Sequence, residues 1–212
     1  MGTIKKGILG GFSGKVGTVV GGSWKGIAYM RSLPQKVKNP RTDGQMSQRS
    51  KFALALGILK PMTPFLRTGW KLYAHKQTPM NAAMSYTLAN AISGAYPDYE
   101  IDPSKVLVSR GSLATAANAA TTAAGGSIEF SWDDNSGVGS AKQTDKALIA
   151  VLNTAKGEAI TDTAGAERTT GTQTVTLPAD WFGDTVEVYL GFISEDGKEV
   201  ANSVYLGSVA IM

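Results

Sequence analysis

Glycine interrupts the hydrophobic pattern of the first 34 residues nine times. Between these glycines stand β-branched and aromatic residues, on both sides of the pair Gly21-Gly22: Val16, Val19, Val20, Trp24, Ile27 and Tyr29. Two β-forming runs around a glycine pair predict a hairpin with a Gly-Gly turn. We therefore expect residues 1–38 to form a Gly-rich basic arm with a β-hairpin; the alternative is a flexible basic leader.

A helical pattern begins after Asn39-Pro40. Thr42 is a good N-cap residue, and Gln45 three positions later completes a capping box, so a helix is expected from there to about Leu59. Its apolar residues fall roughly on one face: Met46, Ala53, Leu56 and Leu59.

Two further helices begin with the same signal, a threonine followed by proline at the first helical position. Thr63-Pro64 predicts a helix through Trp70 to about His75, and Thr78-Pro79 predicts one that closes at Gly94. Three short helices with short loops are expected to pack as one antiparallel group, a helical domain over residues 39–95.

After residue 95 the pattern changes to that of strands. Residues 96–126 are expected to form a linker with extended strands, including a strand over 101–108 that Asp102-Pro103 interrupts and an extended, low-complexity stretch over 114–126. Alternating patterns then predict a β-sandwich domain over 127–212, with strands at 127–132, 146–153, 173–177, 185–194 and 200–212. Its core is expected to contain or border on Trp132, Trp181, Tyr189, Phe192 and Tyr205. The fold class is therefore α+β, ending in an antiparallel immunoglobulin-like or fibronectin-like sandwich.

Charge divides the chain in the same place. Residues 1–100 hold fourteen Lys and Arg against three Asp and Glu, a formal charge of +11, whereas residues 101–212 hold seven against fourteen, a formal charge of −7. Such a contrast indicates a domain boundary near residue 100, with a basic end that attracts an acidic or anionic partner. No apolar run approaches the roughly 18 residues of a membrane helix, so membrane insertion is not expected.

Catalytic and metal-binding patterns are weak throughout. The chain has no cysteine, which excludes disulfides and thiolate chemistry. Its single histidine, His75, weakens any metal-site or catalytic-triad interpretation. The segment 10–16 resembles a phosphate loop, but its first glycine is misplaced and Val16 stands where a hydroxyl is needed. Asp133-Asp134-Asn135-Ser136 lacks the spacing of a calcium loop, and the remaining acidic clusters fall in predicted turns. We expect neither an enzyme nor a cofactor.

The positive charge of residues 1–100 makes nucleic acid a possible class of partner. Ten cations are available to neutralise phosphates: Lys5, Lys6, Lys15, Lys25, Arg31, Lys36, Lys38, Arg41, Arg49 and Lys51. Trp24 and Tyr29 would supply stacking surfaces. The charges are spread out and accompany no nucleic-acid motif. The competing interpretation is therefore that these residues line a protein–protein interface and pair with acidic patches on other copies of the chain.

Several motifs together resemble a known family. They are the G-x-x-G-K-V-G-x-V-V start at 11–20, Trp24-Lys25-Gly26, the segment Asn39-Pro40-Arg41-Thr42 with Gln45, Gln48, Arg49 and Phe52, and the C-terminal Phe130-Ser131-Trp132-Asp133 and Tyr189-Leu190-Gly191-Phe192. The layout is similar to a family of uncharacterised proteins, carried as a domain of unknown function in Bacteroidetes and their phages. The resemblance implies a phage-particle setting and supplies no catalytic residue.

The function expected from the sequence is that of a bacteriophage virion structural protein in the head, neck or tail. Its partners would be other copies of itself and other virion proteins, and its location the virion. The residues expected at the assembly interface are Val16, Val19, Val20, Trp24, Ile27, Tyr29, Arg31, Arg41 and Arg49. Two alternatives stay open: a nucleic-acid-binding protein that uses the basic half, and a surface adhesion or carbohydrate-binding module with Trp181 or Trp132 as a sugar platform.

Overall fold

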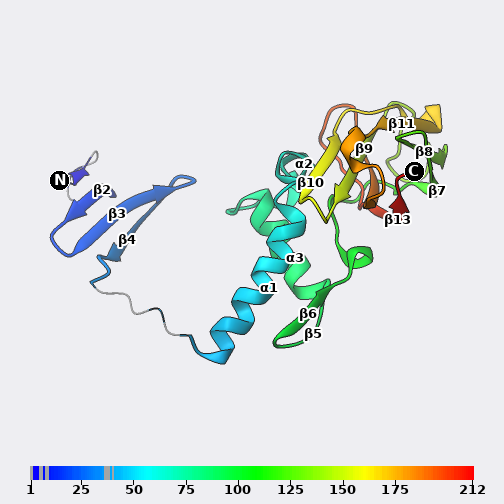
Figure 1. Ribbon diagram of the computed structural model, residues 1–212. Coiled ribbons are helices and arrows are strands. Elements are labelled where there is room, and N and C mark those ends of the chain that lie inside the picture. Colours follow the sequence, from blue (N-terminus) through cyan, green and yellow to red (C-terminus); the bar gives the residue numbers. More distant parts are fainter. Residues whose placement is uncertain (1, 5–6, 8–9, 36–38, 40) are drawn as a thin grey trace. The chain divides into compact units, whose positions relative to one another are not determined.

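The computed structural model in Figure 1 describes residues 2–4, 7, 10–35, 39 and 41–212. It confirms the α+β class: strands come first, helices follow, and a second group of strands completes the chain. Internal contacts divide the chain into two compact units, Met1–Thr42 and Asp43–Met212. We call them the N-terminal unit and the C-terminal unit and describe each by itself.

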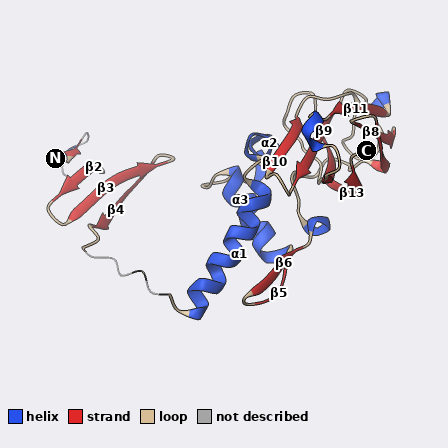
Figure 2. Cartoon of the chain, viewed as in Figure 1, coloured by secondary structure: helices blue, strands red, loops and turns tan. Residues whose placement is uncertain are grey.

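The N-terminal unit is a four-stranded antiparallel sheet rather than a single hairpin (Figure 2). Its strands follow one another in chain order: β1 Thr3–Ile4, β2 Phe12–Val16, β3 Val19–Trp24 and β4 Ile27–Ser32. Two-residue loops join β2 to β3 and β3 to β4, because Val16 pairs with Val19 and Trp24 with Ile27. The central hairpin is thus β2–β3, and β4 is an edge strand of the sheet.

The predicted Gly-Gly turn is wrong. Gly21 and Gly22 lie inside β3, and the chain reverses at Gly17-Thr18 and Lys25-Gly26. Two-residue hairpin loops need left-handed backbone, and Gly17 (φ +57°), Lys25 (φ +48°) and Gly26 (φ +81°) supply it. The glycine pair has another use: its missing side chains leave room for aromatic rings on neighbouring strands.

The three predicted helices are confirmed, with changed ends. They are α1 Asp43–Leu59, α2 Thr63–Gly69 and α3 Pro79–Asn90, and a short 3₁₀ helix, η2 Lys71–Tyr73, follows α2. The Thr78 hydroxyl accepts the amide of Asn81 at 3.1 Å and caps α3 as expected. The predicted face of α1 is confirmed in part, because Leu59 is buried and Met46 and Leu56 are half-buried. It is wrong at Ala53, which is exposed, and it leaves out the buried residues Ala55 and Ile58.

The segment after α3 differs most from the prediction. Residues expected to finish the third helix form the strand β5 Ile92–Ala95, which pairs with β6 Asp98–Ile101. The interruption expected at Asp102-Pro103 is confirmed: the Asp102 carboxylate accepts the amide of Ser104 at 3.0 Å, and a 3₁₀ turn, η3 Pro103–Lys105, follows. The strand expected to continue to residue 108 is wrong, because residues 106–108 form no strand.

The remainder is an antiparallel sandwich, which we call the β-body (residues 106–212). One sheet has the order β10-β9-β12-β13 and the other β11-β8-β7. The strands are β7 Ala117–Ala124, β8 Ser127–Asp133, β9 Lys146–Asn153, β10 Glu158–Asp162, β11 Thr172–Thr176, β12 Thr185–Ile193 and β13 Val204–Ala210, with short 3₁₀ helices η4 Arg168–Thr170 and η5 Ala179–Trp181. The low-complexity stretch expected to be extended is the strand β7.

Strand β9 shows how the helices and the β-body share a core. Ala147, Ile149 and Val151 pack in the cluster between the two sheets. The alternate residues Leu148, Ala150 and Leu152 pack in a second cluster with Phe65, Trp70 and other helical residues. The C-terminal unit is therefore layered as helices, sheet and sheet. The domain boundaries predicted at residues 95 and 127 mark changes of secondary structure. They do not separate independent cores, because the helices and strand β9 share one apolar cluster.

Three of the five aromatic residues expected at the sandwich core lie there, since Trp132, Trp181 and Phe192 are buried in the cluster between the two sheets. The expectation is wrong for Tyr189, which is buried in the cluster with the helical residues, and for Tyr205, which is partly buried against that cluster. Trp181 belongs to η5 rather than to a strand. Both buried indoles also donate hydrogen bonds, Trp132 to the Arg168 carbonyl at 2.8 Å and Trp181 to Glu158 at 3.2 Å. Neither is available as an exposed sugar platform.

Candidate docking surface

The strand register of the N-terminal sheet sorts its side chains onto two faces. Residues directly opposite each other on antiparallel strands point the same way. Lys15 pairs with Val20 and Val20 with Arg31, while Gly22 pairs with Tyr29 and Trp24 with Ile27. One face, which we call the aromatic face, therefore carries Lys15, Val20, Trp24, Ile27, Tyr29 and Arg31.

The opposite face carries a different set. Ile4 pairs with Phe12, Val16 with Val19, and Gly21 with Met30. We call it the methionine face and define it by Ile4, Phe12, Val16, Val19 and Met30. Beside it, an open hollow of about 580 Å³ is lined by Thr18, Val19, Met30, Arg31, Ser32, Leu33 and Gln35.

This sorting changes the interface expected from the sequence. Val16 and Val19 lie on the methionine face, whereas Val20, Trp24, Ile27, Tyr29 and Arg31 lie on the aromatic face. One flat partner cannot contact all of them. The alternation of period two was visible in the sequence, but the misplaced turn concealed which residues face together.

The N-terminal sheet buries almost nothing. Among the described residues of 2–42, only Gly21 is buried. Trp24 is 53% exposed, Tyr29 47% and Met30 71%. Large apolar side chains thus stand in solvent on both faces, and contiguous apolar surface of this kind marks an interaction site.

Glycine gives the two aromatic side chains of the sheet their places. A methyl group on Gly22 would lie 2.8 Å from the Tyr29 hydroxyl oxygen, and one on Gly21 would lie 2.5 Å from the Phe12 ring. Each ring therefore lies over the glycine of the next strand, one ring on each face. This cross-strand cover stabilises strand glycines that would otherwise leave the backbone bare.

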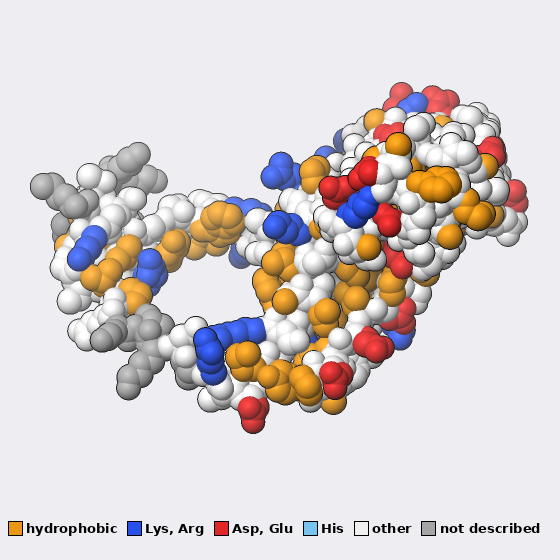
Figure 3. All heavy atoms as spheres, viewed as in Figure 1, with side chains coloured by type: hydrophobic (Ala, Val, Ile, Leu, Met, Phe, Trp, Pro, Cys, Tyr) orange, Lys and Arg blue, Asp and Glu red, His pale blue; other side chains and the backbone are white. Residues whose placement is uncertain are grey.

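Charge adds a second property to this unit. Residues 1–42 contain eight Lys and Arg and no Asp or Glu, a formal charge of +8. Lys15 and Arg31 flank the apolar residues of the aromatic face, and Lys25 lies in the adjoining turn. In Figure 3 the acidic side chains lie over the C-terminal unit, many of them on the β-body, and the charged side chains of the N-terminal strands are basic.

The other predicted interface residues lie elsewhere. Arg41 is exposed after the sheet, and Arg49 is exposed on α1, in the C-terminal unit. Lys5, Lys6, Lys36, Lys38 and Pro40 lie outside the described residues.

The structure also locates the two weaker candidates of the sequence, the phosphate-loop-like segment and the acidic loop at 133–136. Residues 12–16 of the phosphate-loop-like segment form β2. In the acidic loop, Asp134 accepts the amide of Ser136 at 2.9 Å, and Asp133 accepts the Asn118 amide group at 2.7 Å. Within the described ranges no three His, Asp or Glu residues are grouped as metal ligands, and no helix there is long and apolar enough to cross a membrane.

The β-body contains a buried ionic cluster around Arg168 that the sequence did not indicate. Arg168 and Asp145 are both fully buried and joined at 3.2 Å. Arg168 also donates to Asn135 and to the Ala114 carbonyl, and its guanidinium lies 3.8 Å from the centre of the Phe192 ring. Burial lowers the pKa of Arg168, and the charge of Asp145 opposes that shift. The cluster joins three loops to the core and is closed to ligands.

A cationic side chain also covers the aromatic residues of the helices. The Arg110 guanidinium lies 4.4 Å from the ring centre of Tyr73, 5.3 Å from that of Tyr86 and 5.7 Å from that of Trp70. These cation–π contacts hold the first segment of the β-body against the helices. No sequence motif signals either cluster, because their members are far apart along the chain.

Together these features define an α+β protein with a layered C-terminal unit and a basic N-terminal sheet whose large apolar side chains are exposed. The chain belongs to the family of unknown function DUF6266, whose family model matches residues 11–207. A comparison with curated proteins found no match.

Proposed function

We propose that this chain is a structural protein of a bacteriophage particle, acting through contacts with other copies of itself and with other virion proteins. One observation carries the proposal: the N-terminal unit is a folded sheet that exposes apolar side chains on both faces and buries only one residue among those described. A sheet of this kind gains its stability when partners cover it.

The energetic argument concerns the missing core. A small sheet must offset about 1–2 kcal/mol of backbone entropy for each ordered residue. Without buried side chains it has little to offset that cost, and strand glycines raise it. Docking of either face on a partner would supply the missing burial, so that ordering and assembly become linked.

Charge supports the β-body of a neighbouring copy as a partner. The N-terminal unit carries +8 and no carboxylate, whereas residues 101–212 carry −7. Opposite fields on two parts of one subunit steer the basic part of one copy toward the acidic part of the next. Contacts between unlike surfaces of this type build rings or filaments, the usual geometry of particle components.

The first experiment measures self-association by sedimentation velocity on the full chain and on residues 43–212, at low and high salt. The full chain should associate at low salt, dissociate partly as salt screens the charges, and lose association when residues 1–42 are removed. Mass spectrometry of purified particles tests the setting. A full chain that stays monomeric in every condition and is missing from particles would contradict the proposal.

Single-stranded nucleic acid is a second candidate partner, favoured by one specific observation. The aromatic face places Trp24 and Tyr29 beside Lys15 and Arg31 on one surface. Stacking platforms combined with cations are how proteins bind single strands without sequence preference. Titration of a labelled oligonucleotide should show affinity that falls steeply with salt, and Arg31→Ala should lower the salt slope by about 1. Lys198→Ala, an exposed change in the β-body, is the control, and absence of binding at low salt removes this candidate.

A further inference from the structure

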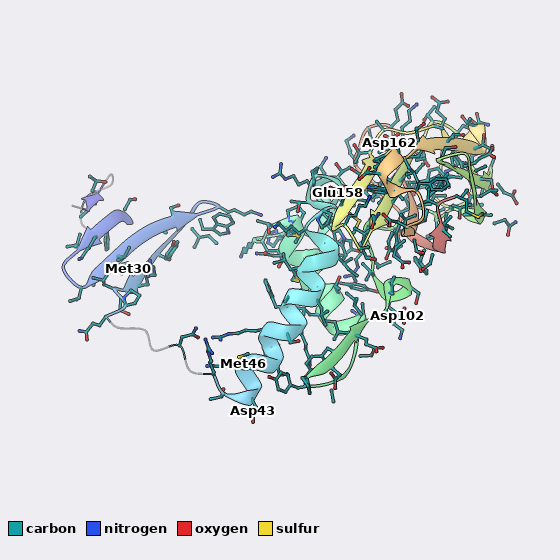
Figure 4. All side chains as sticks on the ribbon, viewed as in Figure 1. Met30, Asp43, Met46, Asp102, Glu158 and Asp162 are labelled. Carbon is teal, nitrogen blue, oxygen red and sulfur yellow. The ribbon has the colours of Figure 1, made fainter. Side chains whose placement is uncertain are left out.

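We propose that the free edge of β4 pairs antiparallel with β4 of a second copy, around a two-fold axis at Met30, to form one eight-stranded sheet. The inference rests on the proposed self-association and names a contact within it. It concerns the backbone edge of the sheet, not the faces discussed above. Figure 4 labels Met30 on this strand.

Hydrogen-bond parity identifies the free backbone groups. The amide of Leu33 donates to the Thr18 carbonyl at 2.7 Å, and Trp24 pairs with Ile27 across a two-residue loop. In an antiparallel ladder, alternate residues bond to the same neighbour. Residues 27, 29, 31 and 33 therefore bond to β3, and the N–H and C=O groups of Ala28, Met30 and Ser32 point away from the sheet.

No device protects this edge within the described residues. Natural edge strands are shielded by prolines, bulges, charges or covering loops. The register of β3 and β4 is continuous over six residue pairs, β4 contains no proline, and its only charge is Arg31. All six of its residues are exposed.

The edge strands of the two β-body sheets carry protective features that β4 lacks. The pairings of β13 and of β7 contain register shifts. Strand β10 begins and ends with a carboxylate, and the loop after it packs on β11, where the amide of Ala166 donates to the Gln173 side chain at 2.8 Å. Among the described strands, the other edges without such features are short: β1 has two residues, and β5 and β6 have four each, against six in β4.

A second copy fits this edge because the pairing is self-complementary. A two-fold register that pairs Met30 with Met30 uses all three outward residues of the strand, since Ala28 then pairs with Ser32. On the aromatic face it sets Tyr29 directly across from Arg31 of the second copy. An arginine over a tyrosine ring is a favourable cross-strand pair, and no two like charges lie directly opposite.

The dependence of self-association on salt distinguishes this contact from docking on the acidic β-body. Two basic units repel each other in the β4 pair, so screening of that repulsion by salt strengthens or preserves the pairing. Attraction between the basic sheet and an acidic surface weakens as salt rises. Self-association by β4 should therefore survive at salt concentrations that abolish the unlike-charge contact.

The decisive experiment places a thiol at the two-fold axis. The chain has no cysteine, so Met30→Cys introduces a single one in the full protein. Opposed residues of a hydrogen-bonded antiparallel pair lie about 5.5 Å apart between Cα atoms, within disulfide range. Under mild oxidation Met30→Cys should form intermolecular disulfides about a hundredfold faster than Ser13→Cys, an exposed position on the inner strand β2. Equal rates would overturn the pairing.

A backbone test removes the outward donor without touching the inner ladder. Met30→Pro deletes an N–H that bonds to no neighbour in β3, and edge strands tolerate proline. Its dimer should be lost in light-scattering chromatography at high salt, while Met30→Ala keeps it. Hydrogen exchange checks the fold: the amides of Tyr29 and Arg31 should stay protected in Met30→Pro. A Met30→Pro variant that keeps both its sheet and its dimer would refute the proposal.

The two proposals fail separately. If Met30→Cys cross-links but the chain is missing from purified particles, the edge pairing holds and the virion function is wrong. If the chain is present in particles and Met30→Cys cross-links no faster than Ser13→Cys, only the edge pairing is wrong.

Discussion

Arg168 is a single residue on which much of the β-body depends. It donates to Asp145, Asn135 and Ala114, and it is fully buried. Asp145→Ala would leave this buried cation without its counterion. Breaking a buried ion pair from one side costs about 3–5 kcal/mol, and we expect a loss of that size in the free energy of unfolding from urea titration.

A matched change tests whether burial causes this effect. Lys198 and Asp196 form an ion pair at 2.9 Å with exposed side chains. Lys198→Ala removes this pair and leaves the turn hydrogen bonds of Asp196 in place, so it should change the free energy of unfolding by less than about 1 kcal/mol. A loss from Asp145→Ala no larger than that from Lys198→Ala would contradict our account of the cluster.

Asp184 gives the β-body a dependence on acid. Its carboxylate accepts the amide group of the buried Asn153 at 2.7 Å and lies 3.4 Å from Lys156. The Asn153 hydrogen bond, then Lys156, holds the pKa of Asp184 below its ordinary value of 3.8. A depressed carboxyl pKa stabilises the fold above the ordinary value, and this stabilisation is lost as pH falls below it.

The corresponding prediction concerns the acid side of the stability curve. Melting temperatures of the wild type should fall as pH drops below about 4, and Asp184→Asn should show a smaller fall over that interval. The two curves should run parallel between pH 5 and pH 7, where the carboxylate is already ionised. Equal acid slopes in both proteins would show that Asp184 carries no proton-linked stability.

At the scale of elements, two helical glycines have opposite effects. A methyl group on Gly57 in α1 would meet nothing within 4 Å, whereas one on Gly69 at the end of α2 would lie 2.6 Å from the Val108 carbonyl oxygen. Gly57→Ala should raise stability by about 0.5–1 kcal/mol through helix propensity. Gly69→Ala should lower it by about 1–3 kcal/mol through overpacking. Thermal unfolding of both variants measures the difference, and the same sign for both would contradict it.

Elements with local signals could be predicted from the sequence. Thr78 caps its helix by bonding a residue three positions away, so the signal and its partner stand in one short segment. The face of α1 could not be predicted in this way, because Ala55 is buried by residues distant in sequence. The hairpin turn was misread because Lys25 adopts positive φ beside Gly26, an arrangement that propensity does not favour for lysine.

The candidate docking surface could be predicted in composition but not in arrangement. Its aromatic and basic residues were identified from the first 34 residues alone. Their division into two faces depends on which residues pair across neighbouring strands. A turn placed at the wrong residues pairs the wrong residues and so predicts the wrong faces. The buried Arg168 cluster gave no signal at all, because Asp145 and Arg168 are separated by 22 residues of strand and loop.

At the scale of the molecule, the two units should unfold independently. Both apolar cores consist only of residues from 55 onward. Residues 43–212 should therefore keep the melting temperature of the C-terminal unit in the full chain, measured by near-ultraviolet circular dichroism. A drop of more than a few degrees in this truncation would show that residues 1–42 support the body.

The absence of acidic residues from 1–42 has a consequence for titration. This segment contains neither a carboxylate side chain nor a histidine. Carboxylates and imidazoles are the side chains whose ordinary pKa values lie below neutrality, and the ordinary pKa of a terminal amine lies above it. Any proton dependence of docking between about pH 5 and pH 6.5 should therefore originate in the partner, and the N-terminal sheet acts as a fixed-charge probe of the surface it meets.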